Sequence, residues 1–154
     1  MHVGFAGLGH MGLPMATRLA AHGFPLTVWN RTASRASPLA GRGIPVAGSP
    51  RELAAASNVI ITMLADGAAV HAIWCGPDGL LAGCRDSCIA VDMSTIGPQA
   101  AREMAAGSAY NPFVRLPLCA LRCAKAAARY RGTLLAVRHV LAQVSCSNRA
   151  STRC

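Results

Sequence analysis

Residues 3–12 read VGFAGLGHMG, and this stretch decides the fold. A short apolar run of strand length leads into the pattern Gly-x-Gly-x-x-Gly, and a helix-like periodicity follows it as far as residue 21. The first glycine permits a tight turn, the second lets the backbone approach a pyrophosphate, and the third lets the helix pack close to the strand. The N-terminus of that helix offers free N–H groups to phosphate. The sequence therefore predicts a dinucleotide-binding turn formed by Gly7, Leu8, Gly9, His10, Met11 and Gly12.

Strand-like and helix-like segments alternate over the first 108 residues. Apolar strands that alternate with helices indicate a parallel sheet covered on both faces. The sequence therefore predicts an α/β fold, a doubly wound parallel-sheet domain of the Rossmann type. The expected strands are 3–6, 26–29, 44–47, 59–63 and 89–92, and the expected helices are 11–21, 34–40, one that begins after Ser49, 66–74 and 98–106.

The end of the second expected strand indicates which dinucleotide fits. An NAD site usually carries an acidic residue there, which accepts hydrogen bonds from the ribose and would repel an added 2′-phosphate. This chain has Asn30, Arg31 and Thr32 instead: an amide, a guanidinium that can donate two N–H groups to phosphate, and a hydroxyl. We expect NADP to be preferred, with NAD as the second choice. The alternative is that Arg31 and Thr32 only begin a solvated loop.

Length and hydropathy favour one globular unit without a membrane segment. The chain has 154 residues, of which 53% are hydrophobic and 14% charged, and its mean hydropathy is +0.36. This length supports one core, and no apolar run approaches the ~18 residues that span a bilayer. Because the glycine motif begins at once, we expect no signal peptide, and we expect a cytoplasmic protein without a membrane partner.

Charge and glycine content change abruptly after residue 108. Residues 1–108 hold seven arginines, all six acidic residues and fourteen of the fifteen glycines, for a net charge of +1. Residues 109–154 hold eight basic residues and no acid, for a net charge of +8. We predict a nucleotide-binding domain over 1–108 and a distinct basic tail over 109–154.

Three interpretations of the basic tail stay open. Its Arg-, Ala- and Cys-rich composition favours a truncated or out-of-frame end, and a divergent last strand and helix is the second interpretation. The third is a basic module for nucleic acid or another acidic partner. The tail shows no aromatic platform and no recognition motif, which disfavours nucleic acid.

Seven cysteines, an odd number in a chain for which we expect no secretory signal, argue against a disulfide framework. Cys84 with Cys88, and Cys119 with Cys123, are spaced i, i+4, which could present two thiolates on one helical face to zinc. Neither pair has a second Cys or His pair at suitable spacing. We predict ordinary reduced thiols and no metal site.

Three stretches resemble the 3-hydroxyisobutyrate dehydrogenase group of the β-hydroxyacid dehydrogenases, which are relatives of 6-phosphogluconate dehydrogenase. They are VGFAGLGHMGLPMATRLAAHGFPLTVWNRT (3–32), NVIITMLADGAAV (58–70) and VDMSTIGPQAAREMA (91–105). The resemblance implies hydride transfer between a nicotinamide dinucleotide and a small 3-hydroxy acid or its semialdehyde. It also implies that Met63, Leu64 and Thr95 contact the cofactor. An oligomeric state does not follow from it.

Beyond residue 107 the chain departs from this family pattern. The family's substrate motif, roughly F-V-D-A-P-V-S-G-G, reads FVRLPLCAL over 113–121, and side chains replace the glycines that would let a carboxylate approach. The only lysine, Lys125, lacks the family's following Asn, and the family's C-terminal all-α domain is not expected here. We assign no catalytic residue and expect cofactor binding with little or no turnover. The alternatives are a short oxidoreductase completed by a partner chain, or a non-catalytic nucleotide- or nucleic-acid-binding protein.

Overall fold

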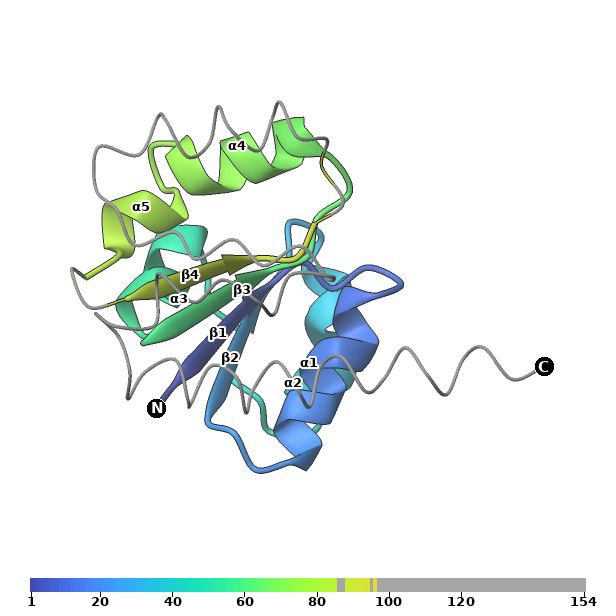
Figure 1. Ribbon diagram of the computed structural model, residues 1–154. Helices are drawn as coiled ribbons and strands as arrows, with labels where there is room; N and C mark the ends of the chain where they lie inside the picture. Colours follow the sequence, from blue (N-terminus) through green and yellow to red (C-terminus); the bar gives the residue numbers. More distant parts are fainter. Residues whose placement is uncertain (86–87, 95, 97–154) are drawn as a thin grey trace, which may run out of the picture.

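A computed structural model describes residues 1–85, 88–94 and 96 of the chain. Strands and helices alternate along it, as the sequence predicts (Figure 1). In chain order the elements are β1 (Val3–Ala6), α1 (Gly12–Ala21), β2 (Leu26–Trp29), the 3₁₀ helix η1 (Ala33–Ala36), α2 (Ser37–Ala40), α3 (Pro50–Ala55), β3 (Val59–Thr62), α4 (Gly67–Cys75), α5 (Leu80–Gly83) and β4 (Ile89–Asp92).

The four strands form one parallel sheet in the order β2-β1-β3-β4. They start level with one another, because Val3 pairs with both Leu26 and Val59, and Val59 pairs with Ile89. Their carboxyl ends therefore meet at one edge. The chain passes from β1 to β2 on one side and returns as β3 on the other, so the strand order reverses at β1. Ligands of open parallel sheets bind at such a reversal.

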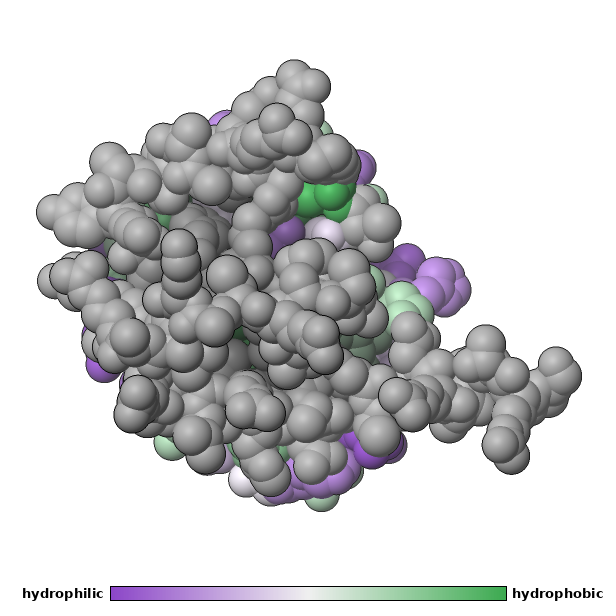
Figure 2. All heavy atoms as spheres, in the orientation of Figure 1, coloured by the Kyte–Doolittle hydropathy of each residue, from purple (hydrophilic) through white to green (hydrophobic). Residues whose placement is uncertain are grey.

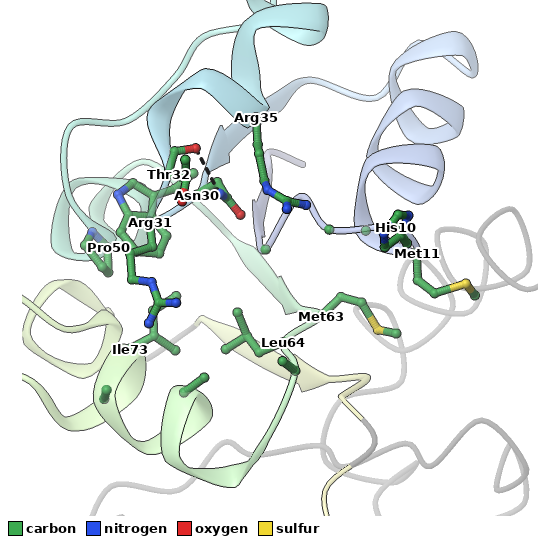
Figure 3. Close-up of a pocket in the computed structure, with 17 residues that line it drawn as sticks. His10, Met11, Asn30, Arg31, Thr32, Arg35, Pro50, Met63, Leu64 and Ile73 are labelled. Carbon is green, nitrogen blue, oxygen red and sulfur yellow. Dashed lines mark hydrogen bonds between the residues drawn. The ribbon is translucent and has the colours of Figure 1, made fainter.

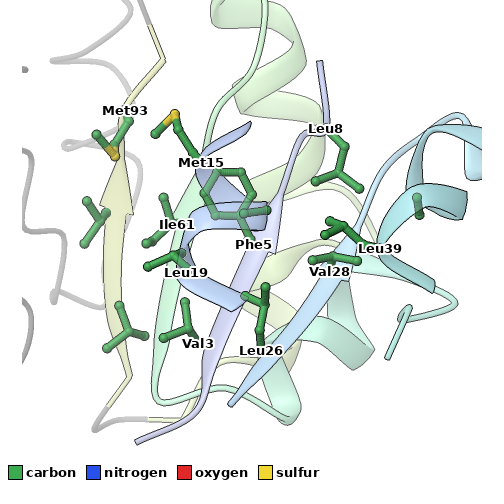
Figure 4. Close-up of a cluster of buried hydrophobic side chains, with 14 of the residues drawn as sticks. Val3, Phe5, Leu8, Met15, Leu19, Leu26, Val28, Leu39, Ile61 and Met93 are labelled. Atoms are coloured by element: carbon green, nitrogen blue, oxygen red, sulfur yellow. The ribbon is translucent and has the colours of Figure 1, made fainter. Parts of the chain in front are cut away.

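Apolar clusters cover both faces of the sheet, which confirms the doubly wound architecture. Figure 1 shows α1 and α2 on one face and α3, α4 and α5 on the other. On the first face, Phe5 packs in one cluster with Leu19 of α1 and Leu39 of α2 (Figure 4). On the second face, Ile60 of β3 belongs to the cluster of Trp74 of α4. Successive strand residues point to opposite faces, so each apolar strand serves both clusters.

The predicted strand over 44–47 is wrong, because only an isolated parallel bridge forms there, between Val28 and Val46. Pro45 has no N–H to extend a ladder. Two backbone hydrogen bonds of 2.9 Å remain, from the N–H of Val28 to the carbonyl of Pro45 and from the N–H of Ala47 to the carbonyl of Val28. The segment therefore lies beside β2 without adding a strand.

The predicted helix over 34–40 is divided into η1 and α2. Pro38 cannot donate the N–H that would continue one α-helix through this stretch. The helix predicted over 66–74 begins at Gly67, because Asp66 is its N-cap. The single turn α5 was not predicted.

Several predictions fall outside the described residues. They concern the helix over 98–106, the domain boundary after 108, and the substrate motif and Lys125 in the tail. Within the described part of the chain, no helix is long and apolar enough to cross a membrane.

Candidate dinucleotide-binding site

A cavity of about 620 Å³ opens at the carboxyl edge of the sheet. It lies between the loops that follow β1, β2 and β3 and helix α4 (Figure 3). Figure 2 shows hydrophilic residues at the surface near the loop after β1, where His10 is exposed. The described residues that line the cavity are Gly7, Gly9, His10, Met11, Gly12, Trp29, Asn30, Arg31, Thr32, Arg35, Pro50, Met63, Leu64, Ala65, Ala69, Ala72 and Ile73.

Two of the three motif glycines are required by the protein's own packing. Gly7 has a φ of +99°, and a side chain there would run into the carbonyl of Met63. A side chain on Gly12 would overlap the carbonyl of Gly7 and crowd the ring of Phe5. The tight turn and the close contact between α1 and the strand therefore both need glycine.

Gly9 differs, because nothing in the described structure requires glycine at this position. Its φ is not positive, and a Cβ placed on it would meet no atom within 4 Å. The residue lines the cavity, so the space that a Cβ would fill is space that a ligand can use. This is the room that the close approach of a pyrophosphate to the backbone needs.

Helix α1 begins without the side-chain cap that α3 and α4 have. Ser49 Oγ accepts the N–H of Glu52 at 3.2 Å in α3, and Asp66 Oδ1 accepts the N–H of Ala69 at 2.8 Å in α4. Met11, the N-cap of α1, makes no side-chain cap bond, and the first turn carries no acidic residue. The positive end of the α1 dipole therefore faces the cavity without an anionic side chain from its own turn.

Asn30 ties the glycine loop to the loop after β2. Its Oδ1 accepts the N–H of Leu8 at 2.8 Å, and its Nδ2 donates to the carbonyl of Thr32 at 2.9 Å. The sequence predicted that this amide would contact the cofactor. In the structure Asn30 lines the cavity, and its two hydrogen bonds hold the glycine loop beside the loop after β2.

Arg31 and Arg35 supply the positive charge of the cavity. Both are exposed, and Figure 3 shows Arg31 extending toward α4 and Arg35 extending toward the glycine loop. Among the described residues, none forms a hydrogen bond or an ion pair with either guanidinium, and none that lines the cavity is a carboxylate. The cavity is therefore built for an anion near these two side chains.

Arg35 was missed from the sequence, although it follows Arg31 by four residues. The predicted helix began at residue 34 and was not connected with the cofactor site. In the structure η1 starts at Ala33 and directs Arg35 to the cavity. A basic residue one helical turn after Arg31 is the signal that could have found it.

Apolar side chains form the rest of the wall. The family resemblance implied that Met63 and Leu64 contact the cofactor. Both residues follow β3 and line the cavity. Trp29 lies at the end of β2, and Ile73 faces the cavity from α4. Such a wall suits the flat faces of a dinucleotide's rings, with a few polar groups to orient them.

A partly buried polar network holds the loop after β3. Asp92 Oδ1 accepts from Thr62 Oγ1 at 2.8 Å and from Ser94 Oγ at 2.7 Å. Ser94 Oγ in turn accepts the N–H of Leu64 at 2.9 Å. The network could not be predicted, because it depends on the register that sets Thr62 beside Asp92.

The remaining predicted residues are placed as follows. Leu8 directs its side chain into the core, where it is 1% exposed, while Thr95 lies outside the described residues. Among the residues that the structure describes, no group of three or more His, Cys, Asp or Glu side chains could hold a metal ion.

The parallel sheet, the glycine turn and the anion-accepting cavity at the strand reversal define a dinucleotide-binding domain of the Rossmann type. The chain belongs to the family of the NAD-binding domain of 6-phosphogluconate dehydrogenase, whose family model matches residues 2–116. The nicotinamide dinucleotide cofactor predicted from the glycine motif is thereby confirmed for the family.

Relatives and solved structures agree with this family. The mitochondrial 3-hydroxyisobutyrate dehydrogenase of Mus musculus is 37% identical over 103 residues, which cover 67% of this chain and 31% of that protein. The 3-hydroxyisobutyrate dehydrogenase of Mycobacterium tuberculosis, solved with L-serine, has a TM-score of 0.65 at 33% identity, covering 75% of this chain and 39% of that one. Psf3 in complex with NADP⁺ and 2-OPP has a TM-score of 0.67 at 36% identity, covering 73% and 40%. The chain thus spans 31–40% of the length of these three proteins.

Proposed function

We propose that this chain is the NADP-preferring cofactor domain of an oxidoreductase that moves a hydride between NADP and a small 3-hydroxy acid or its semialdehyde. One observation carries the proposal: a single cavity joins the open Gly9 to two arginines that no described residue neutralises. The 3-hydroxyisobutyrate dehydrogenase relatives support the substrate class, and the NADP⁺ bound to Psf3 supports the cofactor.

Different lining residues would bind different parts of the dinucleotide. Gly9 and the N-terminus of α1 would receive the pyrophosphate, since both offer backbone N–H groups without a competing side chain. Arg31, Thr32 and Arg35 would receive the 2′-phosphate of NADP. Met63 and Leu64 would lie against the nicotinamide half, together with Thr95 as the resemblance implies. The bound nicotinamide supplies the hydride chemistry, and the domain supplies binding and orientation.

We further propose that the chain alone turns over substrate slowly or not at all. The proposal rests on residues 113–121, where the family's Ser-Gly-Gly is replaced, and on the absence of a catalytic lysine that fits the family's pattern. Backbone N–H groups flanked by side chains approach a carboxylate less closely than those of glycine. A cytoplasmic location stays a prediction from the sequence. The mouse relative is a mitochondrial protein, so membership of the family does not specify the compartment.

Parallel titration and turnover assays on the full chain test both proposals. NADPH and NADH would be titrated by fluorescence, for which Trp29 in the cavity wall provides a reporter. Turnover would be measured with 3-hydroxyisobutyrate and L-serine. Tighter binding of NADPH than of NADH without turnover supports both proposals. Rapid turnover would contradict the second, and failure to bind either nucleotide would contradict the first.

A further inference from the structure

A side-chain hydrogen bond holds the loop after β3 at the point where the backbone pairing of β3 with β4 ends. Among the described residues, the last backbone hydrogen bond between these two segments runs from the N–H of Met93 to the carbonyl of Thr62 at 2.9 Å. Beyond it, the N–H of Leu64 donates to a side chain, Ser94 Oγ, at 2.9 Å. The position of Leu64 therefore depends on one hydroxyl that the loop after β4 supplies.

The carboxylate of Asp92 fixes the direction in which this hydroxyl points. Asp92 is 8% exposed, and its Oδ1 accepts from Ser94 Oγ at 2.7 Å, from the N–H of Ser94 at 3.2 Å and from Thr62 Oγ1 at 2.8 Å. A serine hydroxyl has one proton to donate, and an ionised carboxylate can only accept. Ser94 therefore donates its proton to Asp92 and turns a lone pair toward the N–H of Leu64. Hydrogen bonds to a carboxylate are stronger than neutral ones, so this orientation is firmly held.

Leu64 lies where its position affects the cavity. It lines the cavity, and a Cβ placed on Gly7 would lie 3.0 Å from its Cδ2, so its side chain lies against the glycine turn. The strand order β2-β1-β3-β4 puts the loop after β3 and the loop after β2, which carries Arg31, on opposite sides of this turn. In Figure 3, Met63 likewise lies on the side of the cavity away from Arg31. A dinucleotide with its 2′-phosphate at Arg31 and its pyrophosphate at the glycine turn would have its nicotinamide half beside Leu64.

We propose that Ser94, oriented by Asp92, is a positioning residue that holds the loop after β3 in place for the nicotinamide half of the cofactor. It acts through the backbone N–H of Leu64 and does not need to touch the ligand. This proposal rests on the proposed cofactor function, because it assigns Leu64 to one part of the same dinucleotide. The Ser94 hydroxyl should therefore contribute to the affinity for the whole dinucleotide but not to the affinity for its adenosine half alone.

Two ligands separate the two halves of the site. NADPH contains both halves, whereas adenosine 2′,5′-bisphosphate keeps the adenosine and its two phosphate positions and lacks the nicotinamide half. Dissociation constants for both ligands would be measured by calorimetric titration of the full chain, with Ser94→Ala as the test variant. Ser57→Ala is the matched control, because Ser57 is buried, donates its hydroxyl to the carbonyl of Leu53 at 2.6 Å and does not line the cavity.

Ser94→Ala should lower the affinity for NADPH about three- to tenfold and leave the affinity for the bisphosphate within about twofold of the wild-type value. Ser57→Ala should leave the ratio of the two affinities unchanged, because a general loss of structure lowers both affinities together. Equal losses for both ligands in Ser94→Ala, or an unchanged affinity for NADPH, would overturn the proposal and leave the proposed function intact. If the wild type binds neither ligand, the proposed function fails as well.

Amide hydrogen exchange, followed by NMR on the full chain, tests the positioning hydrogen bond without any cofactor. In Ser94→Ala the N–H of Leu64 should exchange at least about tenfold faster relative to that of Met63 than in the wild type, because alanine offers no acceptor. Met63 is the internal reference, since its N–H donates to the carbonyl of Ala6 at 2.9 Å. Asp92→Asn is the second variant, and it should change the exchange ratio and the affinity ratio in the same direction by a smaller factor, because its amide oxygen can still accept. An unchanged exchange ratio in Ser94→Ala would overturn the proposal.

Discussion

The glycine loop and the arginine side of the cavity are built in different ways. Gly7 and Gly12 are enclosed by the protein's own atoms, so the loop has its shape because the fold requires it. Arg31 and Arg35 are exposed, and no described residue holds either guanidinium. The loop is thus part of the scaffold, whereas the arginines are added to its surface.

This difference separates affinity for dinucleotides in general from discrimination between them. The pyrophosphate is common to NAD and NADP, and it is the group that the loop can receive. The 2′-phosphate distinguishes the two, and it is the group that suits the arginines. Changes in the loop should therefore affect both cofactors, and changes in the arginines should affect only NADP.

The largest expected effect comes from Gly12→Ala. Its Cβ would overlap the backbone of Gly7, which cannot move away as a flexible side chain could. We expect the free energy of unfolding to fall by about 3 kcal/mol, with loss of cofactor binding. Urea denaturation would measure this as a lower midpoint with an unchanged slope. Wild-type stability in this variant would show that the packing of α1 on the strand is looser than described.

Gly9→Ala should separate binding from folding. Its Cβ meets no protein atom and its φ is not positive, so stability should stay unchanged or rise by up to about 1 kcal/mol. The affinities for NADPH and NADH should both fall about ten- to hundredfold, because hydrogen bonds to a charged phosphate are lost. Calorimetric titration and a melting curve on the same sample would check both effects. Unchanged affinity for both cofactors would mean that no ligand occupies the space beside Gly9.

Arg31→Ala should affect only the phosphorylated cofactor. Loss of a charged hydrogen-bond donor should lower the affinity for NADPH about tenfold or more and leave the affinity for NADH within about twofold of the wild-type value. Arg42→Ala is the matched control, since Arg42 is exposed and does not line the cavity. An equal loss for both cofactors would place Arg31 against a part of the dinucleotide that they share.

The smallest effect is expected for Arg35→Ala. Arg35 extends toward the glycine loop from η1 (Figure 3), and its side chain is exposed, so solvent screening reduces its contribution to binding. We expect NADPH affinity to fall about two- to fivefold, with a larger effect at low salt. Titrations at two salt concentrations would measure it. A loss of NADPH affinity that does not depend on salt concentration would indicate that Arg35 contributes through van der Waals packing and not through its charge.

Much of the fold could be predicted from local patterns. The glycine motif fixed the first strand, the turn and the first helix, because all three lie within one continuous stretch. The strand over 44–47 failed because Pro45 removes a donor that hydropathy does not register. The break between η1 and α2 has the same origin at Pro38.

Parts of the candidate site could be predicted from residue identity and from the family resemblance. Gly9 and Arg31, predicted from their identity and position, line the cavity, and so do Met63 and Leu64, which the resemblance implied. The hydrogen bond between Asn30 and Leu8 joins residues 22 positions apart, and the one between Ser94 and Leu64 joins residues 30 positions apart. No local sequence pattern predicts such hydrogen bonds. Such contacts follow from the strand register, which the sequence does not specify by itself.

We infer that the exposed arginines select the 2′-phosphate, whereas the glycine loop can receive either cofactor. Adenosine 2′,5′-bisphosphate and 5′-AMP differ only in that phosphate, so their dissociation constants for wild type and Arg31→Ala test it most directly. We expect the wild type to bind the bisphosphate at least about tenfold more tightly than 5′-AMP and the difference largely to disappear in Arg31→Ala. Equal binding of the two nucleotides by the wild type would contradict it.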